Sequence, residues 1–418
     1  MSPANQKVLA IVAGGGPAPG INGVISAATI EAINNGVKVM GIYDGFKWLA
    51  TGDMTHIRPL QIPDVSRIHL SGGSIIRTSR ENPSKSKEKL TNVVRALKEL
   101  KVDYLITIGG DDTAFTASVI EQEMRGRIRM AHVPKTIDND LPLPGYASTF
   151  GYQTARHIGV NLVQNIMEDA QTTGRWYFVV TMGRKAGHLA LGIGKASGAT
   201  LTIISEEFKG QYVTLKQLCD ILEGAMIKRK SMGRDDGVAI LAEGLAERFN
   251  PDELKTLGHV ELDEFDHIRL SELDFGKILK DEVKRRFEQR GQEIPTPVTK
   301  DIGYELRCAP PIPFDSELAR DLGFNAVKFL LQGGSGALIN IQEGKLTPIP
   351  LSEMIDPSTG KITVRYVDTN TESYDVALEY MIRLKTEDFK DKERIRKLAK
   401  TANLTPDEFT EGFKYLVE

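Results

Sequence analysis

Short apolar runs alternate with amphipathic helical patterns along this sequence, and the alternation restricts the fold more than any other feature. Residues 7–13 predict a strand, and residues 21–34 predict a helix that ends before Gly36. Residues 83–100 predict a further helix, which leads into a strand at residues 103–108. This order of elements is typical of α/β proteins, in which helices cover a mostly parallel sheet. The sequence therefore predicts an α/β fold with doubly wound, mostly parallel sheets.

The same alternation continues through the rest of the chain. Further helices and strands are predicted at residues 154–169, 175–181, 199–205, 214–230, 237–242, 315–331 and 336–342. With 418 residues, of which 41% are hydrophobic, the chain is too long for one ordinary core and long enough for two. We expect one domain over residues 1–150 with about 304–345, and a second over residues 151–303 with about 346–418.

Composition and charge argue against several classes of protein. A net charge of −3, with 26% charged residues, leaves no basic excess for binding nucleic acid. Cys219 and Cys308 lie far apart in the sequence, so neither a disulfide framework nor a zinc site is expected. The apolar run at residues 8–13 is too short for a signal peptide or a membrane helix, which predicts a cytoplasmic protein without membrane contact. Residues 344–418 carry no recognisable motif, and residues 385–400 predict a solvated helix.

Two acidic segments follow predicted strands. The strand at residues 103–108 leads into Gly-Gly-Asp-Asp at residues 109–112, and the strand at residues 129–133 leads into Pro-Lys-Thr-Ile-Asp-Asn-Asp at residues 134–140. In an open parallel sheet, residues just past the carboxyl ends of the strands line the crevice where ligands bind. Carboxylates and a lysine gathered there suit a magnesium-bound phosphoryl donor and a hydroxyl group that must lose a proton.

The acidic residues suit different roles in such a reaction. Asp111 is the candidate magnesium ligand, because one carboxylate beside a di- or triphosphate suffices for this ion. Asp138 suits the general base, and Asp140 either assists it or holds the loop. Two structural alternatives stay open. Residues 138–140 could form an Asx-rich turn, and Asp112 could cap a helix that starts near residue 114.

A glycine-rich segment lies between the first predicted strand and the first predicted helix. It reads Gly-Gly-Gly-Pro-Ala-Pro-Gly-Ile-Asn at residues 14–22. Backbone N–H groups and a helix N-terminus form a good seat for an anion there, and a tight turn that needs glycine for steric reasons is the alternative. The segment matches neither GxxxxGK[ST] nor GxGxxG, which counts against a Walker-type NTPase and a dinucleotide-dependent oxidoreductase.

Taken together, these segments resemble the phosphofructokinase family. Residues 15–22 are similar to its GG-x-APG-x-N pattern, residues 136–140 repeat its TIDND signature, and residues 182–184 are similar to its MGR motif. The resemblance runs from about residue 7 to residue 342. It implies two Rossmann-like domains with the active site in the cleft between them. It also implies that a second subunit completes this site, in a homodimer or homotetramer that needs Mg²⁺.

Asp112 and Lys135 resemble the pyrophosphate-dependent branch of the family, since ATP-using relatives typically have glycine at both positions. Asp112 would place charge and bulk where the α-phosphate of ATP must lie. Lys135 would supply a cation where charge develops in the transition state, although a solvated loop lysine is the alternative. The resemblance implies that Gly15 and Arg80 bind pyrophosphate together with Lys135.

The remaining matches concern a sugar phosphate. The resemblance implies that Glu243 binds sugar hydroxyl groups, that Arg307 reaches the 6-phosphate, and that Arg175 extends into the site of a neighbouring subunit. Residues 304–307 stand where ATP-dependent relatives have a His-x-x-Arg segment. The full set expected to bind fructose 6-phosphate is Thr136, Ile137, Asp138, Arg175, Met182, Gly183, Arg184, Glu243, Tyr304, Glu305, Leu306 and Arg307.

The activity that the resemblance implies is reversible phosphoryl transfer from pyrophosphate to the 1-hydroxyl of fructose 6-phosphate, giving fructose 1,6-bisphosphate and phosphate. Asp138 would take the proton, with Lys135 and Asp112 beside it at the catalytic centre. An ATP-dependent phosphofructokinase of the same fold is one alternative, and a regulatory subunit without catalysis is another. A regulatory subunit is expected to have lost Asp111 or Asp138, and both are present.

Overall fold

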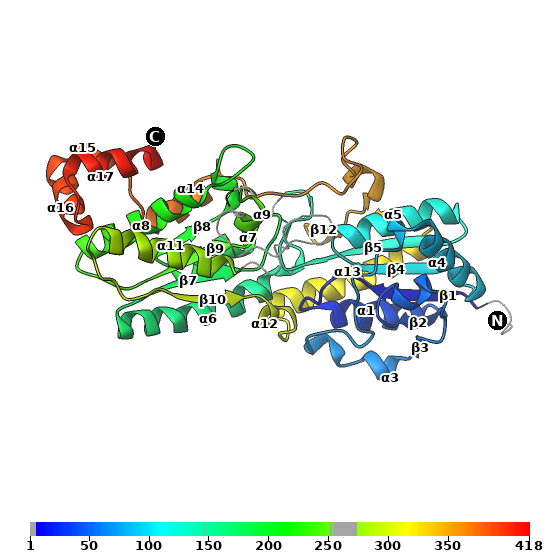
Figure 1. Cartoon of the computed structure of the whole chain (residues 1–418). Coiled ribbons are helices and arrows are strands. Elements are labelled where there is room, and N and C mark those ends of the chain that lie inside the picture. Colours follow the sequence, from blue (N-terminus) through cyan, green and yellow to red (C-terminus); the bar gives the residue numbers. More distant parts are fainter. Residues whose placement is uncertain (1–5, 146, 251–252, 254–273) are drawn as a thin grey trace. The chain divides into compact units, whose positions relative to one another are not determined.

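The chain divides into two compact units (Figure 1). The computed structural model describes residues 6–145, 147–250, 253 and 274–418. Unit 1 consists of Met1–Ala155 and Tyr304–Arg365, and unit 2 consists of Arg156–Gly303 and Tyr366–Glu418. The main difference from the division expected from the sequence lies in residues 346–365, which belong to unit 1.

In its described residues, unit 1 contains an eight-stranded sheet in the order β14-β11-β5-β4-β1-β2-β3, with β6 beside β5. All neighbouring strands are parallel except β3 and β14, which pair antiparallel at the two edges. The strands are β1 (Val8–Ala13), β2 (Lys38–Ile42), β3 (Ile57–Leu60), β4 (Tyr104–Gly109), β5 (Arg129–Thr136), β6 (Phe150–Gly151), β11 (Ala337–Leu338) and β14 (Ile349–Pro350).

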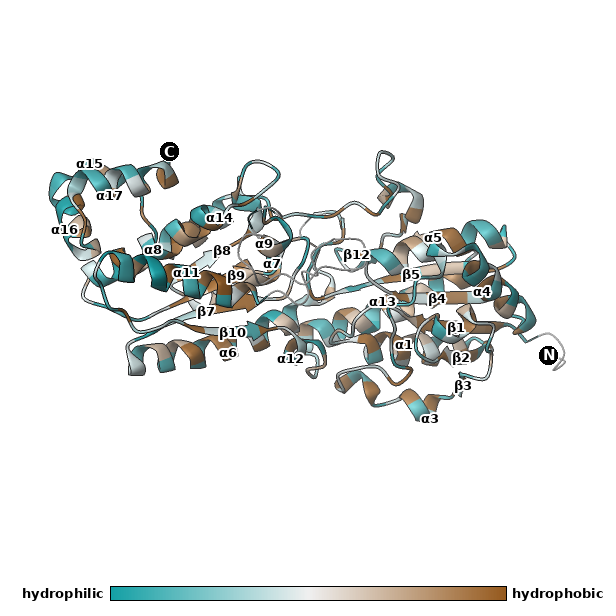
Figure 2. Ribbon diagram, viewed as in Figure 1, coloured by the Kyte–Doolittle hydropathy of each residue, from teal (hydrophilic) through white to brown (hydrophobic). Residues whose placement is uncertain are grey.

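Helices cover both faces of this sheet. Successive strand residues point to opposite faces. In β1, Leu9 and Ile11 therefore pack in the core with α1 and α13, and Ala10 and Val12 pack in the core with α4 and α5. Coverage on both sides explains why the central strands are apolar along their length (Figure 2). The helices are α1 (Ile21–Asn34), α2 (Lys47–Ala50), α3 (Ile62–Val65), α4 (Lys87–Glu99), α5 (Asp111–Met124), α12 (Tyr304–Arg307) and α13 (Pro313–Leu331).

Unit 2 has a parallel four-stranded sheet among its described residues, in the order β10-β7-β9-β8. Its strands are β7 (Trp176–Thr181), β8 (Leu201–Ile203), β9 (Gly237–Ala242) and β10 (Val298–Ile302). Its helices are α6 (Tyr152–Thr173, which begins in unit 1), α7 (His188–Ser197), α8 (Leu215–Ser231), α9 (Gly244–Glu247) and α11 (Phe275–Gln289). No helix in the described ranges of either unit is both long and apolar enough to cross a membrane.

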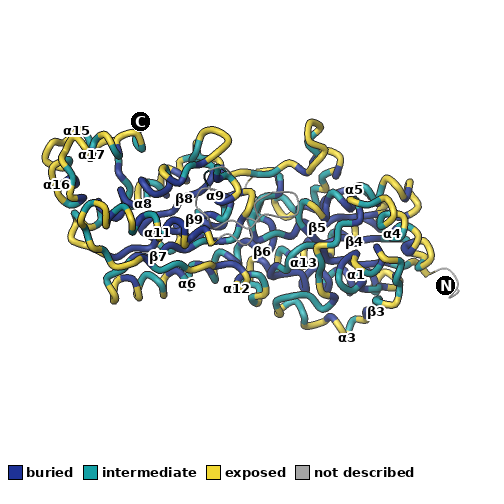
Figure 3. Tube along the Cα trace, in the orientation of Figure 1, coloured by how far each residue is buried: buried dark blue, intermediate teal, exposed yellow. Residues whose placement is uncertain are grey.

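The C-terminal residues of unit 2 add four helices in the described chain, α14 (Glu372–Tyr380), α15 (Thr386–Lys390), α16 (Lys392–Ala402) and α17 (Pro406–Phe413). Much of α15 and α16 is exposed on the outside (Figure 3). Buried apolar side chains nevertheless join these helices to the core around α8 and α11; they include Ala377, Leu398, Ala402, Phe409 and Phe413. The segment therefore folds as part of unit 2.

The fold class predicted from the sequence is confirmed, and Ile21–Asn34 and Gly237–Ala242 have the predicted bounds. Three predicted elements were wrong in part. The helix at residues 83–100 is interrupted at Ser86, whose side chain caps α4. The helix at residues 385–400 breaks at Asp391, which caps α16.

The third error concerns residues 336–342, where one strand was predicted. This segment splits into β11, which pairs with β5, and β12 (Ile341–Gln342), which forms a hairpin with β13 (Lys345–Leu346). A single apolar run can therefore serve two different strand pairings, and its periodicity does not reveal the change of partner.

Candidate active site

A cavity of about 210 Å³ opens in unit 1 where β1, β4 and β5 end. These three strands are neighbours in the sheet, so the loops that follow them converge, as expected at the carboxyl edge of a parallel sheet. The lining brings together every residue that was expected from the sequence to handle the phosphoryl donor: Gly15, Arg80, Asp111, Asp112, Lys135 and Asp138. Thr136 and Asp140 also line it.

The glycine loop at residues 14–16 leaves space for cations. Gly15 has φ of +78°, and a Cβ there would lie 3.3 Å from Lys135 Nζ. A Cβ on Gly16 would lie 3.4 Å from Arg307 Cζ, which places this guanidinium beside the same loop. The Gly15 N–H donates to the Ser79 carbonyl oxygen. That N–H is therefore paired within the protein, and the expectation that Gly15 binds pyrophosphate stays a prediction.

Lys135 is buried, with 5% of its surface exposed, and its Nζ donates to the Gly16 carbonyl oxygen. Burial lowers the Lys135 pKa from 10.5 to about 8; Asp138 opposes this shift, and Arg307 adds to it. The alternative of a solvated loop lysine is therefore wrong. A buried cation of this kind gains a favourable partner when an anion enters the cavity.

The first acidic segment forms the start of α5. Gly110 is the N-cap and the helix begins at Asp111, so Asp111 and Asp112 lie in its first turn. The alternative of Asp112 as the N-cap is wrong. A Cβ on Gly109 would lie 2.3 Å from the Thr113 side chain, so this tight turn requires glycine. The first N–H groups of a helix lack intrahelical partners and favour anions, so this end of α5 suits a phosphate.

Below this turn, the buried side chain of His132 holds it in place. His132 Nδ1 lies 2.9 Å from Thr107 Oγ1, and Nε2 lies 3.1 Å from the Gly109 carbonyl oxygen. Burial lowers the His132 pKa to about 3, so the ring is neutral, and Nε2–H donates to Gly109. The role of His132 could not be predicted from the sequence, because a histidine inside an apolar run carries no distinctive signal.

The second acidic segment forms a sharp turn at the end of β5. Asn139 has φ of 56°, a left-handed conformation that asparagine tolerates better than most residues. The Asp138 N–H donates to Thr136 Oγ1 at 3.0 Å, and Thr149 Oγ1 donates to the Thr136 carbonyl at 2.9 Å. Ile137 is 6% exposed, so its side chain belongs to the core. The bond to Thr136 Oγ1 is that of an ST turn, and the Asp138 carboxylate lines the cavity. An Asx-rich turn at residues 138–140 stays a prediction.

Unit 2 assembles part of the expected sugar-phosphate site. Met182, Gly183 and Arg184 follow β7, and Glu243 follows the adjacent strand β9. The Gly183 N–H donates to Glu243 Oε2 at 3.3 Å, and Arg184 Nε lies 3.8 Å from Glu243 Oε1. Glu243 also stands directly before α9. It is therefore both an acid at a helix N-terminus and a member of this cluster.

Arg175 lies apart from that cluster, because it stands directly before the first residue of β7, whereas the cluster follows the last one. Six strand residues span about 20 Å at the usual rise, so Arg175 cannot join Arg184 at one ligand within this chain. The expectation that Arg175 extends to a neighbouring subunit stays a prediction.

The short helix α12 belongs to unit 1 and distributes its four residues differently. Tyr304 is 76% exposed, and the Arg307 guanidinium lies over its ring, 5.0 Å from the ring centroid. Leu306 is fully buried, so its side chain belongs to the core. Glu305 is exposed. Arg307, expected to bind the 6-phosphate, lies beside Gly16 of the donor loop.

The donor set fits a magnesium ion bound together with a phosphate ligand. In the described ranges, no three His, Cys, Asp or Glu side chains gather as a site made by protein alone. Mg²⁺ commonly uses one or two carboxylates, several waters and the phosphate oxygens of its substrate. Asp111 is the first residue of α5 and lines the cavity, so it offers such a carboxylate.

Comparisons with known proteins agree with this geometry. The family described as Phosphofructokinase matches residues 8–330. The chain is 54% identical over 415 residues to the pyrophosphate--fructose 6-phosphate 1-phosphotransferase of Thermotoga maritima, covering 98% of this chain and 99% of the relative. It is 49% identical over 427 residues to the enzyme of the same name from Naegleria fowleri, covering 100% of this chain and 98% of the relative.

A solved structure gives the same answer for the fold. The pyrophosphate-dependent phosphofructokinase of Nitrosospira multiformis superimposes with a TM-score of 0.68 over 90% of each chain, at 17% sequence identity. The family match covers most of the chain, and the two relatives match it end to end. The chain belongs to the phosphofructokinase family.

Proposed function

We infer that the chain transfers a phosphoryl group from pyrophosphate to the 1-hydroxyl of fructose 6-phosphate, giving fructose 1,6-bisphosphate and phosphate. The 54% identity to a full-length relative named for this reaction is the observation that carries the inference. The reaction is reversible, because pyrophosphate and a sugar phosphate ester have similar transfer potentials. The roles given below to individual residues are our proposals.

Pyrophosphate occupies the cavity of unit 1. Its negative charge meets Lys135, which loses its desolvation penalty when an anion approaches, and Arg80 at the exposed rim. Asp111 would hold Mg²⁺, which would neutralise part of the pyrophosphate charge. The glycines at residues 15 and 16 let the donor approach the backbone closely, because a Cβ at either position would crowd Lys135 or Arg307.

Asp138 acts as the general base. It accepts the proton of the 1-hydroxyl as that oxygen forms a bond to phosphorus, while the bond from phosphorus to the bridging oxygen breaks and phosphate leaves. Lys135 stays beside the transferred group and stabilises the charge on its oxygens. The support is geometric, since Asp138 and Lys135 line one cavity and the fixed turn at Asn139 orients the loop.

Fructose 6-phosphate is held by the Met182-Gly183-Arg184 loop and by Glu243. The ion pair of Arg184 and Glu243 supports this role, because it presents a guanidinium for phosphate and a carboxylate for hydroxyl groups on one strand edge. Thr136, Arg175 and Arg307 complete the proposed set, with Arg175 serving a second subunit of a homo-oligomer. A cytoplasmic location also stays a prediction from the sequence.

Donor choice is the function of Asp112 and Lys135. Both line a cavity of about 210 Å³, below the range of about 300–1,000 Å³ typical of sites for larger organic ligands. A carboxylate at Asp112 repels the extra phosphate of a nucleotide, and Lys135 fills space that a nucleotide needs. These two residues support pyrophosphate over the ATP-dependent alternative.

Steady-state assays of the purified chain test this proposal. The chain is supplied with fructose 6-phosphate and Mg²⁺, with either pyrophosphate or ATP as donor. Activity with pyrophosphate alone is expected. The double variant D112G/K135G should lose most of this preference; an unchanged preference would show that neither residue controls the donor. Activity with ATP alone would favour the ATP-dependent alternative, and no activity with either donor would favour the regulatory subunit.

A further inference from the structure

Arg365 lies in the part of the chain that carries no recognisable motif, yet its side chain reaches the catalytic loop. It is the last residue of unit 1. We propose that Arg365 is a positioning residue for the general base, which it serves by clamping the loop that carries Asp138. This inference rests on the proposed function, because it concerns the rate of that reaction.

All three nitrogens of the half-buried Arg365 side chain donate hydrogen bonds. Its Nε and Nη2 donate to the Asn139 carbonyl oxygen at 3.1 and 2.9 Å, and Nη2 also donates to Asn139 Oδ1 at 2.5 Å. Its Nη1 donates to the Ala147 carbonyl oxygen at 2.7 Å. The backbone N–H of Arg365 donates to the Asp140 carbonyl oxygen at 2.8 Å. One residue thus binds both the start and the end of the loop.

The loop needs such support because of its backbone conformation. Asn139 has φ of 56°, which costs energy for a residue other than glycine. Its carbonyl and side-chain oxygens both accept hydrogen bonds from Arg365, and Oδ1 also accepts from the Thr149 N–H at 3.1 Å. Asp138 and Asp140 flank this residue, so a change at Asn139 re-aims both carboxylates.

The charge of Arg365 suits the same role. Burial lowers its pKa, and Asp140 raises it, so the electrostatic partner of the clamp is an acid of the catalytic loop. Arginine stays protonated in proteins, and its planar group can serve several acceptors at fixed angles. Lysine could keep the charge, but it could not reproduce the fork that joins Asn139 to Ala147.

Arg365 is a positioning residue and not a catalytic one. The cavity is lined by Asp138 and Asp140, and the arginine acts on them through the backbone between. Its loss should therefore lower kcat more than it raises the KM for pyrophosphate. Arg80 lies on another segment, and Lys135 lies in β5, before the turn that the clamp binds.

The test compares R365M and R365K with R129M as a matched control. Arg129 also lies in unit 1 and donates to a backbone carbonyl, that of Leu330 at 3.1 Å, but it starts β5 at the end away from the cavity. We expect R365M to lower kcat about 30-fold with KM for pyrophosphate within threefold, R365K to recover only part of the loss, and R129M to keep both within twofold.

A double variant separates positioning from general stability. N139G removes the side-chain acceptor and still allows the positive φ. The backbone carbonyl at position 139 still accepts from Arg365 in N139G, so the combined loss in R365M/N139G should fall below the product of the two single losses. Hydrogen exchange of residues 138–149 should be faster in R365M and unchanged in R129M, and this measurement remains informative if R365M is too unstable to assay.

The outcomes are distinct from failure of the proposed function. A wild-type chain without pyrophosphate-dependent activity would overturn that function, and the inference would fall with it. An active wild type with R365M within twofold of its kcat would overturn the inference alone. Fully additive losses in R365M/N139G would do the same, as would unchanged exchange of residues 138–149.

Discussion

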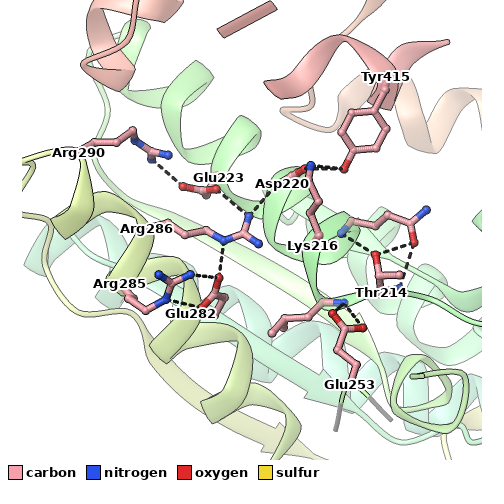
Figure 4. A network of polar contacts seen from close by, with 12 residues as sticks. Thr214, Lys216, Asp220, Glu223, Glu253, Glu282, Arg285, Arg286, Arg290 and Tyr415 are labelled. Carbon is pink, nitrogen blue, oxygen red and sulfur yellow. Dashed lines mark hydrogen bonds and ion pairs between the residues drawn. The ribbon is translucent and has the colours of Figure 1, made fainter. Parts of the chain in front are cut away.

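Both units bury charged side chains, but they neutralise them to different degrees. In unit 2, Asp220 and Glu223 of α8 face Arg286 of α11 and Arg290, which directly follows α11 (Figure 4). Arg286 Nη1 lies 2.6 Å from Asp220 Oδ1, and Arg290 Nη2 lies 2.6 Å from Glu223 Oε1. The Tyr415 hydroxyl, from the C-terminal end, donates to Asp220. Each buried charge there has an opposite charge at hydrogen-bond distance.

The buried cation of unit 1 is arranged differently. Lys135 donates to a neutral carbonyl, that of Gly16, and burial lowers its pKa to about 8. Burial also raises the pKa of Glu223, so a buried charge costs energy in either unit. The difference is that Glu223 faces Arg286 and Arg290, whereas Lys135 lines a cavity that can admit an anion. The comparison teaches that the degree of neutralisation, and not burial itself, separates a structural charge from a functional one.

The strongest test of this comparison removes the proposed general base, Asp138, from the cavity of unit 1. We expect D138N to lower kcat about 10³-fold, because general base catalysis contributes on the order of 10²–10⁴-fold. The melting temperature should not fall, since the amide keeps the size of the side chain. Steady-state kinetics and thermal unfolding measure the two effects. A variant with near wild-type turnover would show that Asp138 does not take the proton.

The structural region should show the opposite behaviour. R286M removes the cation that Asp220, Glu223 and Glu282 share. Each acid keeps a second cation, so we expect the free energy of unfolding to fall by about 1–3 kcal/mol. In the folded protein, kcat should stay within twofold of wild type. Urea unfolding checks the first value.

Arg285 provides the matched control, because its side chain is 53% exposed and pairs with Glu282 at the surface. R285M should cost less than about 1 kcal/mol. Equal losses in R286M and R285M would contradict the view that buried pairing stabilises unit 2.

Replacing Lys135, the incompletely neutralised cation of unit 1, should lower activity and raise the stability of the folded protein. We expect K135M to lower kcat/KM for pyrophosphate about 10²-fold, as loss of a cation at the transferred group does. The free energy of unfolding at pH 7 should rise by about 1–3 kcal/mol, because a pKa lowered by burial marks an energetic cost of the charged form. K38M, at an exposed strand residue, should change neither quantity. A less stable K135M would contradict the comparison.

A smaller effect is expected at the C-terminal end of the network in unit 2. Y415F removes the hydroxyl that donates to Asp220 and should lower the free energy of unfolding by about 1 kcal/mol. Turnover should not change. A change in kcat, measured well below the melting temperature, would show that this contact also affects the reaction.

Much of unit 1 could be predicted from the sequence, because its signals are local. Strand ends followed by glycine or acid placed Asp111, Asp112, Lys135 and Asp138, and the parallel sheet brought them to one cavity. The roles of the individual residues remain predictions. What the sequence analysis missed depends on contacts between distant segments. Arg365 reaches Asn139 across 226 residues, and nothing in the local pattern around it signals that contact.

Contacts between distant segments also limit what the short motifs predict for Gly15 and Leu306. Gly15 fits an anion-binding pattern, but its N–H pairs with Ser79, 64 positions along the chain. Leu306 was carried over with its neighbours as part of a motif, although its side chain belongs to the core. In short motifs, the sequence specifies which segment takes part, and tertiary packing decides which atoms remain available to a substrate.

The smallest predicted effect is the uptake of less than one proton when pyrophosphate binds. It tests the comparison of the two units directly. Because the pKa of Lys135 is about 8 in the folded protein, below its ordinary value of 10.5, the unfolded chain binds more protons between these values. The contribution of Lys135 to stability therefore improves as pH rises through that window. Bound pyrophosphate should raise this pKa, so binding at pH 9 should take up most of one proton and binding at pH 7 very little. Calorimetric titrations with magnesium pyrophosphate, in buffers of different ionisation heat, measure the uptake, and K135M corrects for protons of the ligand. Equal uptake in wild type and K135M at pH 9 would mean that Lys135 is already neutralised before the anion arrives, and the distinction between the two regions would then disappear.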